Sequence, residues 1–511
     1  MKRTIWKSLT VAVGLIVLFG SLIGAPMAQE PKILTVVLPG EPSHLDPKDS
    51  VGYTPDIIYH IYRKLYKFTP EMVPVPDLVV SQKISDDKKV WTLGLQKEVT
   101  FFDGTPVNAQ AVKYSIDRMK DPKLAAPMAE LYEHVKEVQV IDDYTVRIET
   151  DVPFSPLQFN LAHPNTGVIS PKADKELGSG FGRAPVSCGP YKVERWSTGD
   201  RLVLTRFDDY KGGPRPYFDK IIFRNVPASE TRLAMVESGE ADVALRMNAT
   251  MAQAAGNNPA LQIIPLRGTR LLYFYYQMNM KPTDDIRVRK ALSMAVDRDL
   301  IRTKICRGAA DPARSVIKQG VAFSCDVGDL KYDPVQARAL LTEAGVLGQK
   351  IKILGAEGAY ENDRAISEAV AGFIRAVGME PELEILSDSG ARLEAYTRRG
   401  HNLGMVAWGG STGDPDAYLR RQLWGKTAGK PWCFAGYNNP KVDALIEQAA
   451  QSFDNAERAK LYCEIQRLIW NDYPWLIIHR VSGFTVARAN LADVEPYVNS
   501  QALVFTNARR K

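Results

Sequence analysis

In two stretches of the chain, a predicted strand is followed by a helix and then by another strand. Such a unit places its strands parallel in one sheet and lays the helix across a face of that sheet. We therefore expect an α/β protein with two sheet-and-helix lobes. The first unit is predicted at 221–226, 230–237 and 241–245, and the second at 351–354, 363–377 and 382–386.

The length of 511 residues also requires more than one hydrophobic core. The most aromatic run, 271–279, is predicted as a strand buried on both faces and is assigned to the first lobe. A second buried run, 405–408, is the next strand of the second lobe. A cleft between the two lobes follows from this arrangement.

The stretch 404–419 is the strongest candidate for a ligand site. A buried strand ends there in a glycine-rich turn, and open α/β folds bind ligands in crevices beside strand ends. The tryptophan offers a rigid apolar face, and the polar residues after it can converge on something small. In the alternative interpretation, the stretch is a hairpin with an ordinary core tryptophan. The predicted contacts in this stretch are Trp408, Gly410, Ser411, Thr412 and Asp414.

Composition and charge exclude several classes of protein. The apolar fraction is 45%, which is that of an ordinary globular protein. The formal net charge of +6 is matched by six cations at the two ends of the chain, at positions 2, 3, 7 and 509–511, so the body is close to neutral. Nucleic-acid binding needs a clustered basic face, so we expect no nucleic-acid partner.

The first residues predict the compartment. Cations, an apolar run and small residues ending at Ala28 are typical of a secretory signal peptide over 1–28. No cysteine lies near that cleavage site, so we expect an exported protein that is not a lipoprotein. No later stretch reaches the apolar length of a membrane span.

Five cysteines in an exported chain leave at least one unpaired. Cys306 and Cys325 flank a loop rich in glycine, proline and charge, and we predict a disulfide between them. Cys433 with Cys463 is the second candidate pair. Neither pair has the close spacing of a zinc or redox site.

Catalytic and metal patterns are weak. Ser85 and Lys88 satisfy S-x-x-K but lie in a polar hairpin, whereas the nucleophile of that motif needs a buried helix start. The six histidines are scattered, and none forms a pair at helical spacing. We therefore expect no metal, no cofactor and no catalytic residue.

The chain resembles the family 5 extracytoplasmic solute-binding proteins of ABC importers, which include dipeptide-, oligopeptide- and nickel-binding proteins. The matching stretches occur in family order and span nearly the whole chain after residue 28. They are FFDGTPVNAQAVKYSIDRM (101–119), GPYKVERW (189–196), VRKALSMAVDRDLI (288–301), YDPVQARALLTEAG (332–345), WGGSTGDPDAYL (408–419) and GYNNPKVDALIEQA (436–449).

The resemblance implies a two-lobed periplasmic-binding-protein fold with a ligand cleft between the lobes. It implies a monomeric periplasmic receptor that delivers a small molecule or peptide to the permease subunits, which work with a cytoplasmic ATPase, and no catalysis. Closure is a population shift, so the ligand must contact both lobes. The expected division is lobe I at 29–72, 203–285 and 484–511, an extra subdomain of lobe I at 73–202, and lobe II at 286–483.

The sequence departs from the pattern of the dipeptide binders. Their loop after the tryptophan carries an aspartate for the peptide ammonium, and the matching position here is Ser411. Their arginine for the peptide carboxylate has no counterpart in 355–363, and only Arg364 is close. Asp414 could substitute for the aspartate, although before a proline it is interpreted as a turn residue.

These departures favour a neutral or hydroxyl-rich ligand, such as an oligosaccharide or a modified peptide. Its expected contacts also include Asn279, Tyr275 and Glu41. Two other functions stay open at this point. One is an exported serine hydrolase or acyltransferase-like enzyme acting through Ser85, and the other is a periplasmic chaperone-type binding protein.

Overall fold

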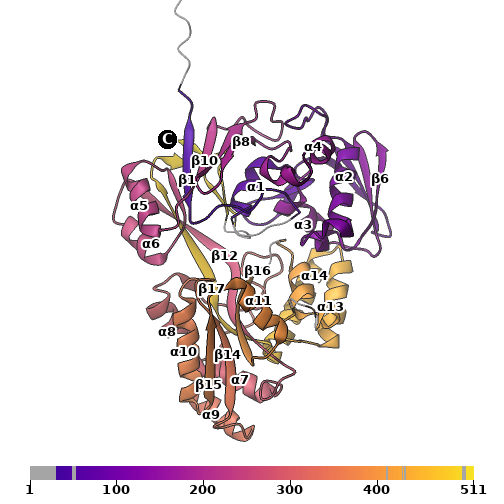
Figure 1. Cartoon of the computed structure of the whole chain (residues 1–511). Helices are drawn as coiled ribbons and strands as arrows, with labels where there is room; N and C mark the ends of the chain where they lie inside the picture. Colours follow the sequence, from indigo (N-terminus) through magenta and orange to yellow (C-terminus); the bar gives the residue numbers. More distant parts are fainter. Residues whose placement is uncertain (1–29, 49–52, 410–411, 429, 431–432, 498–501) are drawn as a thin grey trace, which may run out of the picture.

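Two long strands run through the molecule and join its two halves. The computed structural model describes residues 30–48, 53–409, 412–428, 430, 433–497 and 502–511. Strands β12 (Leu261–Tyr276) and β17 (Trp475–Arg488) pair antiparallel and cross together from the upper half to the lower half in Figure 1. Their pairing is irregular between Arg267 and Leu271, which marks the level of the crossing.

One twisted sheet therefore extends through both lobes. Its strand order is β15-β14-β16-β12-β17-β11-β1-β10-β9-β8, and β13 (Ala310–Asp311) pairs with β17 beside this path. Strands β11, β1, β10, β9 and β8 belong to the first lobe, and strands β13, β14, β15 and β16 belong to the second lobe. Strand pairing, and not an isolated linker, thus connects the two lobes.

The predicted strand-helix-strand unit of the first lobe is confirmed as parallel. Strands β10 and β11 both pair parallel with β1, which lies between them, and α5 connects the two along the chain. Helix α1 is held against this lobe by an apolar core that continues to the C-terminal residues. The elements are β1 (Ile33–Leu38), α1 (Pro55–Ile61), β8 (Tyr191–Ser197), β9 (Arg201–Arg206), β10 (Lys220–Asn225), α5 (Ser229–Ser238), β11 (Val243–Met247) and α6 (Ala249–Ala255).

The second lobe repeats the arrangement around its own sheet. Strand β14 pairs parallel with both β15 and β16, as predicted. Apolar clusters cover both faces of this sheet. The predicted cap of α9 is confirmed, because the Asp333 side chain accepts from the backbone N–H of Gln336 at 2.8 Å. The elements are α7 (Ile286–Ala295), α8 (Arg298–Leu300), α9 (Pro334–Glu343), β14 (Lys350–Ala356), α10 (Asp363–Ala376), β15 (Glu380–Leu386), α11 (Ser389–Arg398), β16 (Leu403–Gly409), α12 (Pro415–Leu423), α13 (Pro440–Gln451) and α14 (Asn455–Asp472).

The extra subdomain has a separate four-stranded sheet in the order β4-β5-β7-β6. Its helix α2 packs beside β6, and the apolar core between them is distinct from those of the lobes. The elements are β4 (Val79–Ile84), β5 (Val90–Leu95), α2 (Ala109–Lys120), β6 (Val135–Asp142), β7 (Thr145–Thr150), α3 (Leu157–Leu161) and α4 (Pro171–Leu177). Short strands elsewhere are β2 (Tyr66–Phe68), β3 (Pro74–Pro76), β18 (Leu491–Ala492), β19 (Glu495–Tyr497), β20 (Ala502–Val504) and β21 (Arg509–Arg510).

The sheet divides the chain differently from the expected boundaries at two places. The subdomain expected over 73–202 includes β8, which the structure pairs with β9 in the sheet of the first lobe. The second lobe expected over 286–483 omits residues 271–276 of β12, which pair with β16. Both differences arise because a strand follows its hydrogen-bonding partners rather than its neighbours in the sequence.

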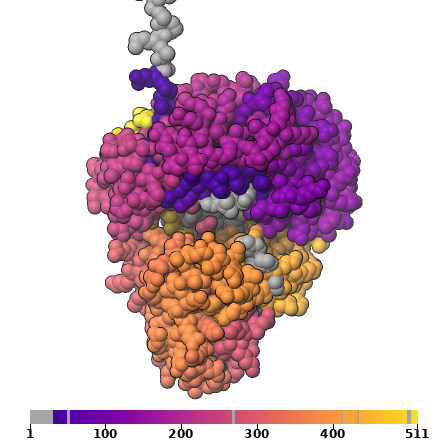
Figure 2. Space-filling view, in the orientation of Figure 1, coloured from indigo at the N-terminus to yellow at the C-terminus, as the bar shows by residue number. Residues whose placement is uncertain are grey.

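The two halves touch on both sides of the crossing strands. On one side the subdomain rests on the second lobe, where the backbone N–H of Ser155 donates to the carbonyl of Ala450 at 2.8 Å. On the other side Arg307 Nη1 donates to Thr250 Oγ1 of α6 at 3.2 Å. Figure 2 shows a hollow between these contacts. Within the described ranges, no helix is both long and apolar enough to span a bilayer.

Candidate ligand-binding cleft

The upper end of β16 forms one wall of the cleft. Leu271 of β12 pairs with Trp408 on one side and with Arg480 of β17 on the other, so these residues lie at one level of the sheet. The Trp408 ring is half-buried, and the Arg421 guanidinium lies 5.0 Å from its centroid. A cation over an indole face is attractive. The strand therefore presents a braced indole where the sheet opens toward the first lobe.

A buried lysine lies behind this tryptophan. Lys318 is 3% exposed, and its Nζ donates to the carbonyl of Trp408 at 2.6 Å. Burial holds the pKa of Lys318 well below its usual value, and the nearby guanidiniums of Arg270 and Arg480 lower it further. An ammonium has three donors, and the structure shows one of them in use here.

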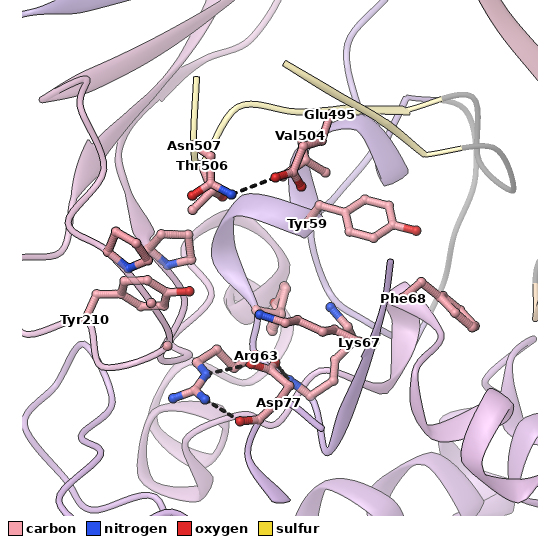
Figure 3. A pocket seen from close by; sticks show the side chains of 16 residues that line it. Tyr59, Arg63, Lys67, Phe68, Asp77, Tyr210, Glu495, Val504, Thr506 and Asn507 are labelled. Atoms are coloured by element: carbon pink, nitrogen blue, oxygen red, sulfur yellow. Dashed lines mark hydrogen bonds and ion pairs between the residues drawn. The ribbon is translucent and has the colours of Figure 1, made fainter. Parts of the chain in front are cut away.

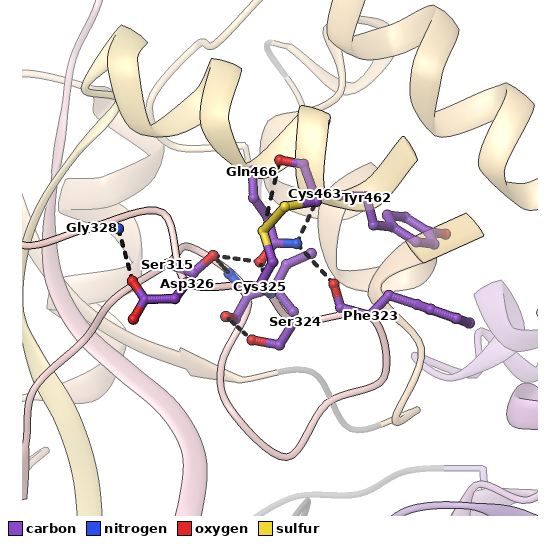
Figure 4. Close-up of a disulfide and its surroundings, with 10 residues drawn as sticks. Ser315, Phe323, Ser324, Cys325, Asp326, Gly328, Tyr462, Cys463 and Gln466 are labelled. Atoms are coloured by element: carbon purple, nitrogen blue, oxygen red, sulfur yellow. Dashed lines mark hydrogen bonds between the residues drawn. A yellow bond between two sulfur atoms is a disulfide. The ribbon is translucent and has the colours of Figure 1, made fainter. Parts of the chain in front are cut away.

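A disulfide positions the loop that carries this lysine (Figure 4). Cys325 is bonded to Cys463 of α14 across 138 residues, and Gln466 of the same helix accepts from the backbone N–H of Cys325 at 3.1 Å. The Gln466 side chain also donates to the carbonyl of Phe323 at 2.9 Å. Helix α14 thus holds the loop at Phe323 and Cys325, which follow Lys318 in the sequence.

The predicted disulfides are wrong. Cys306 does not pair with Cys325, and Cys433 does not pair with Cys463, because the two bonded cysteines are Cys325 and Cys463. Cys306 is a buried free thiol near the start of the loop, and Cys433 is also buried and free. The prediction paired cysteines that are closer in the sequence, whereas the fold brings α14 over the loop at a sequence separation of 138 residues.

Arg270 stands at the level where β12 crosses between the lobes. Its side chain is solvent-exposed, yet groups from both lobes shift the pKa of its guanidinium, as expected for a residue in a cleft. Desolvation by the surrounding protein lowers the pKa of Arg270, and the neighbouring Arg246 lowers it further. Asp56 of the first lobe and Tyr360 of the second act in the opposite direction.

The first lobe presents a paired charge to the same space. Arg246 Nη2 lies 2.7 Å from Asp56 Oδ2, and the guanidinium covers the Tyr53 ring at 4.6 Å from its centroid. Arg246 has a left-handed backbone, with φ of 52°, which is uncommon for a residue with a side chain. Burial raises the pKa of Asp56, and Arg246 opposes that shift.

A cavity lies between the subdomain and the second lobe. Its volume is about 670 Å³, within the usual range of small-molecule sites. It borders the turn after β16, because a side chain added at Gly413 would contact Met72, which lines the cavity. Other lining residues include Trp91, Phe159, Val321 and Phe453. This apolar space adjoins the polar end of the cleft.

Another cavity, of about 130 Å³, lies where the first lobe meets the subdomain (Figure 3). Lys64 and Lys67 line it, and burial lowers the pKa of Lys64 to about 8. Glu495 also lines it and accepts from Asn507 Nδ2 at 2.6 Å. Its lining residues come only from the first lobe, the subdomain and the C-terminal segment, so it does not reach the second lobe.

The polar residues predicted after Trp408 serve the turn itself. Asp414 begins α12 and forms a buried ion pair with Arg458 at 2.7 Å, while Tyr462 donates to the same carboxylate at 3.3 Å. Thr412 is buried and donates to the carbonyl of Asp414 at 2.9 Å. The interpretation of Asp414 as a turn residue agrees with this geometry. Gly410 and Ser411 lie outside the described residues.

The structure does not bring Tyr275 and Asn279 to the tryptophan. Tyr275 pairs with Gly404 and not with Trp408, so about four residues of strand, roughly 13 Å, separate it from that level. Asn279 follows the end of β12, still further from the crossing. The sequence could not reveal this, because the register of β12 against β16 depends on tertiary pairing.

Two other predicted contacts are engaged elsewhere. The Glu41 carboxylate accepts from Trp196 Nε1 at 3.3 Å and from the backbone N–H of Gly199 at 3.0 Å. Arg364 is exposed at the start of α10 and pairs with Glu357 and Glu368. The charges of both residues are therefore engaged by other groups of this chain.

The sequence prediction missed the cations of the cleft. Arg270 directly precedes the apolar aromatic run 271–276 in the same strand, and a cation at that end of the run was an available signal. Lys318 had no such signal, because its role depends on the fold of a long loop. Over the ranges that the structure describes, no group of histidine, cysteine and acidic side chains could hold a metal ion.

Comparisons with known proteins agree with this two-lobed architecture. Residues 73–430 match the family described as "Bacterial extracellular solute-binding proteins, family 5 Middle". The glutathione-binding protein GsiB of Escherichia coli (strain K12) is 30% identical over 484 residues, which cover 93% of each chain. The homologue of that name from Pectobacterium atrosepticum is 30% identical over 442 residues, 85% of each chain.

Solved structures share the fold at lower identity. NikA from Brucella suis in complex with Fe(III)-EDTA superposes with a TM-score of 0.84 at 23% identity, covering 94% of this chain and 100% of that one. A dipeptide-binding protein from Pseudoalteromonas sp. SM9913 in complex with Met-Leu gives 0.81 at 22%, with the same coverage.

Two lobes, an extra subdomain and a cleft at crossing strands define a solute-binding receptor of the periplasmic-binding-protein fold. The chain belongs to the family 5 bacterial extracellular solute-binding proteins. It acts as the solute-binding receptor of an ABC importer, and the family consists of transport receptors and not of enzymes.

Proposed function

We propose that the chain captures a modified peptide between its lobes, in the periplasm, and delivers it to the permease as a closed monomer without catalysis. The observation that carries this proposal is the state of Asp414. Its carboxylate is 1% exposed and bonded to Arg458, so it is not available to the ammonium of an ordinary peptide.

The other charge partner expected by analogy with dipeptide binders is also engaged by acidic groups of this chain. Arg364 is solvent-exposed at the start of α10 and pairs with Glu357 and Glu368. A receptor without these two charges in place is poorly suited to unmodified dipeptides, because burying an unpaired charge costs several kcal/mol. This supports a peptide with different chemistry at its ends.

Relatives named as glutathione-binding proteins make glutathione the first ligand to test. Glutathione keeps a free α-ammonium, but its γ-glutamyl link leaves a carboxylate on the same carbon as that ammonium. The ammonium therefore has a negative charge beside it within the ligand, which the ammonium of an ordinary dipeptide does not have. An oligosaccharide was the other ligand predicted from the sequence. The guanidinium of Arg270, on the strand that pairs with Trp408, favours an acidic ligand over a neutral sugar.

Lobe closure follows from the position of the cleft. A ligand lying against Trp408 of the second lobe and against Tyr53 and Arg246 of the first would contact both lobes. Such a ligand stabilises the closed arrangement, since only contacts that differ between open and closed forms shift the population.

Titration calorimetry with the chain from residue 29 onward tests the ligand. We expect glutathione to bind at micromolar concentration or tighter, and unmodified dipeptides and oligosaccharides to bind at least 50-fold more weakly. Trp408→Ala should weaken glutathione binding at least 10-fold. Trp424→Ala is the matched control, because Trp424 lies between Arg420 and Lys426 of the same lobe. Tight binding of ordinary dipeptides without glutathione binding would contradict the proposal.

A further inference from the structure

We propose that Arg270 and Lys318 form an anion subsite at the crossing of β12 and β17, which binds a carboxylate of the captured solute. This inference rests on the proposed function, because it specifies the chemistry recognised in the same cleft. It assigns the recognition of negative charge to the second lobe and to two residues that come from different elements.

The first argument is that these two cations lack acidic partners. The other cations of the cleft and its surroundings are neutralised: Arg246 pairs with Asp56, and Arg480 with Asp311, both at 2.7 Å. Across the described part of the chain, no carboxylate lies within ion-pair distance of Arg270 or Lys318. Lys318 is 3% exposed, and the cost of burying its charge disfavours the protonated form in the free protein. A carboxylate that arrives beside it would stabilise that protonated form.

The second argument is convergence. Arg270 of β12 pairs with Gly409, the residue after Trp408, and the Trp408 carbonyl accepts from Lys318, which lies on the loop bonded to α14. The charge of Arg270 also lowers the pKa of Lys318. Arg270 is also within electrostatic range of Asp56 and Arg246 across the cleft. The two cations are thus held beside the space between the lobes by independent parts of the second lobe.

The third argument concerns the geometry of the donors. Lys318 Nζ makes one hydrogen bond, to Trp408, which leaves donors for an incoming oxygen. The exposed guanidinium of Arg270 provides a planar set of donors that matches a carboxylate. One carboxylate can accept from both residues while the rest of the peptide lies against the indole.

The test uses calorimetry on the chain from residue 29 onward with two matched ligands, glutathione and its dimethyl ester, in which both carboxylates are neutral. We expect the wild type to bind glutathione at least 50-fold more tightly than the diester. In Arg270→Gln, that ratio should fall below threefold. Arg375→Gln, which removes an exposed arginine of α10, should retain the wild-type ratio. Equal affinity for acid and ester, or an unchanged ratio in Arg270→Gln, would overturn the subsite while leaving the receptor function intact.

A second probe separates the subsite from the choice of glutathione. Malonate, a small dicarboxylate, should raise the melting temperature of the wild type and of Arg375→Gln at constant ionic strength. The double variant Arg270→Gln with Lys318→Met should show no such rise. If glutathione does not bind but this malonate difference appears, the proposed ligand fails and the subsite stands. A rise of equal size in all variants, or in none, would overturn the subsite.

Discussion

The two walls of the cleft differ in whether their charged side chains have ion-pair partners. On the wall of the first lobe, Arg246 is bonded to Asp56 and covers the Tyr53 ring. On the wall of the second lobe, Lys318 and Arg270 have no carboxylate partner among the described residues. The two charges of the first wall therefore pair with each other in the free protein, whereas we propose that an acidic solute supplies the partner of the second wall.

This difference indicates how the two lobes divide recognition. A satisfied wall can contribute shape and aromatic contact without changing its own ionisation. An unsatisfied wall is less stable without ligand, and it gains most when a negative charge arrives, because desolvated charges interact strongly. The second lobe then determines the selectivity for acidic ligands. Closure brings the first lobe into contact with a ligand that the second lobe has already bound.

The largest predicted effect comes from breaking a paired charge of the second lobe. Asp414→Asn leaves Arg458 buried without its partner, so the free energy of unfolding should fall by about 3–5 kcal/mol. Urea denaturation measures this. Glu447→Gln, which breaks the exposed pair with Lys426, is the control and should change stability by less than about 1 kcal/mol. A similar small change in both variants would contradict the expectation that a buried charge of this lobe is costly without its partner.

The second effect comes from releasing the loop that carries Lys318. Replacing Cys325 and Cys463 together by serine should lower the free energy of unfolding by about 2–5 kcal/mol, because the bond closes a long loop. It should also weaken binding of the acidic ligand more than that of its ester. Reductant should destabilise the wild type and leave the double variant unchanged; a double variant with full stability and full affinity would show that the bond has no such role.

The third effect concerns the unpaired lysine. Unfolded Lys318 takes up a proton below about pH 10.4, and burial among Arg270, Arg480, the Trp408 carbonyl and Tyr418 resists that proton in the folded state. Stability of the wild type should therefore fall as pH drops below that value, by up to about 1.4 kcal/mol per unit.

The variant Lys318→Met removes this proton uptake. Relative to the wild type, its free energy of unfolding at pH 7 should be higher by about 1.4 kcal/mol for each unit by which burial lowers the pKa of Lys318, and the difference should shrink as pH rises toward 10. Denaturation curves at several pH values give both quantities. A difference that is independent of pH would show that Lys318 keeps its ordinary pKa.

The smallest effect is expected at the contact between the subdomain and the second lobe. Arg421 Nη1 lies 2.5 Å from Glu130 Oε1 and helps to hold the two halves together. Glu130→Gln should weaken ligand binding only two- to fivefold, because this pair is partly exposed. Glu133→Gln, at an exposed neighbouring position, serves as the control in the same calorimetric titration. A loss larger than that of Arg270→Gln would shift the main role from the charged wall to this contact.

Local patterns in the sequence were sufficient for much of the fold. The parallel strands around α10 and the cap at Asp333 follow from periodicity and from side chains that bond to nearby backbone. The placement of Trp408 at the end of a strand beside a turn was predictable for the same reason. These features depend on residues within a few positions of one another.

Features that depend on distant residues were not predictable. Asp414 meets Arg458 across 44 residues, and Cys325 meets Cys463 across 138, so neither pairing leaves a local pattern. The separation of Tyr275 from Trp408 was not predictable, because the strand register decides which residues share a level with Trp408. Lys318 reaches the same tryptophan only through the folding of its loop.

A crystal structure of the complex with glutathione tests the central claim most directly. The account predicts a closed form in which the ligand lies against the Trp408 ring and one carboxylate is within hydrogen-bonding distance of both Arg270 and Lys318 Nζ. A ligand bound in the cleft with both carboxylates directed away from these two residues, toward the first lobe or solvent, would contradict it.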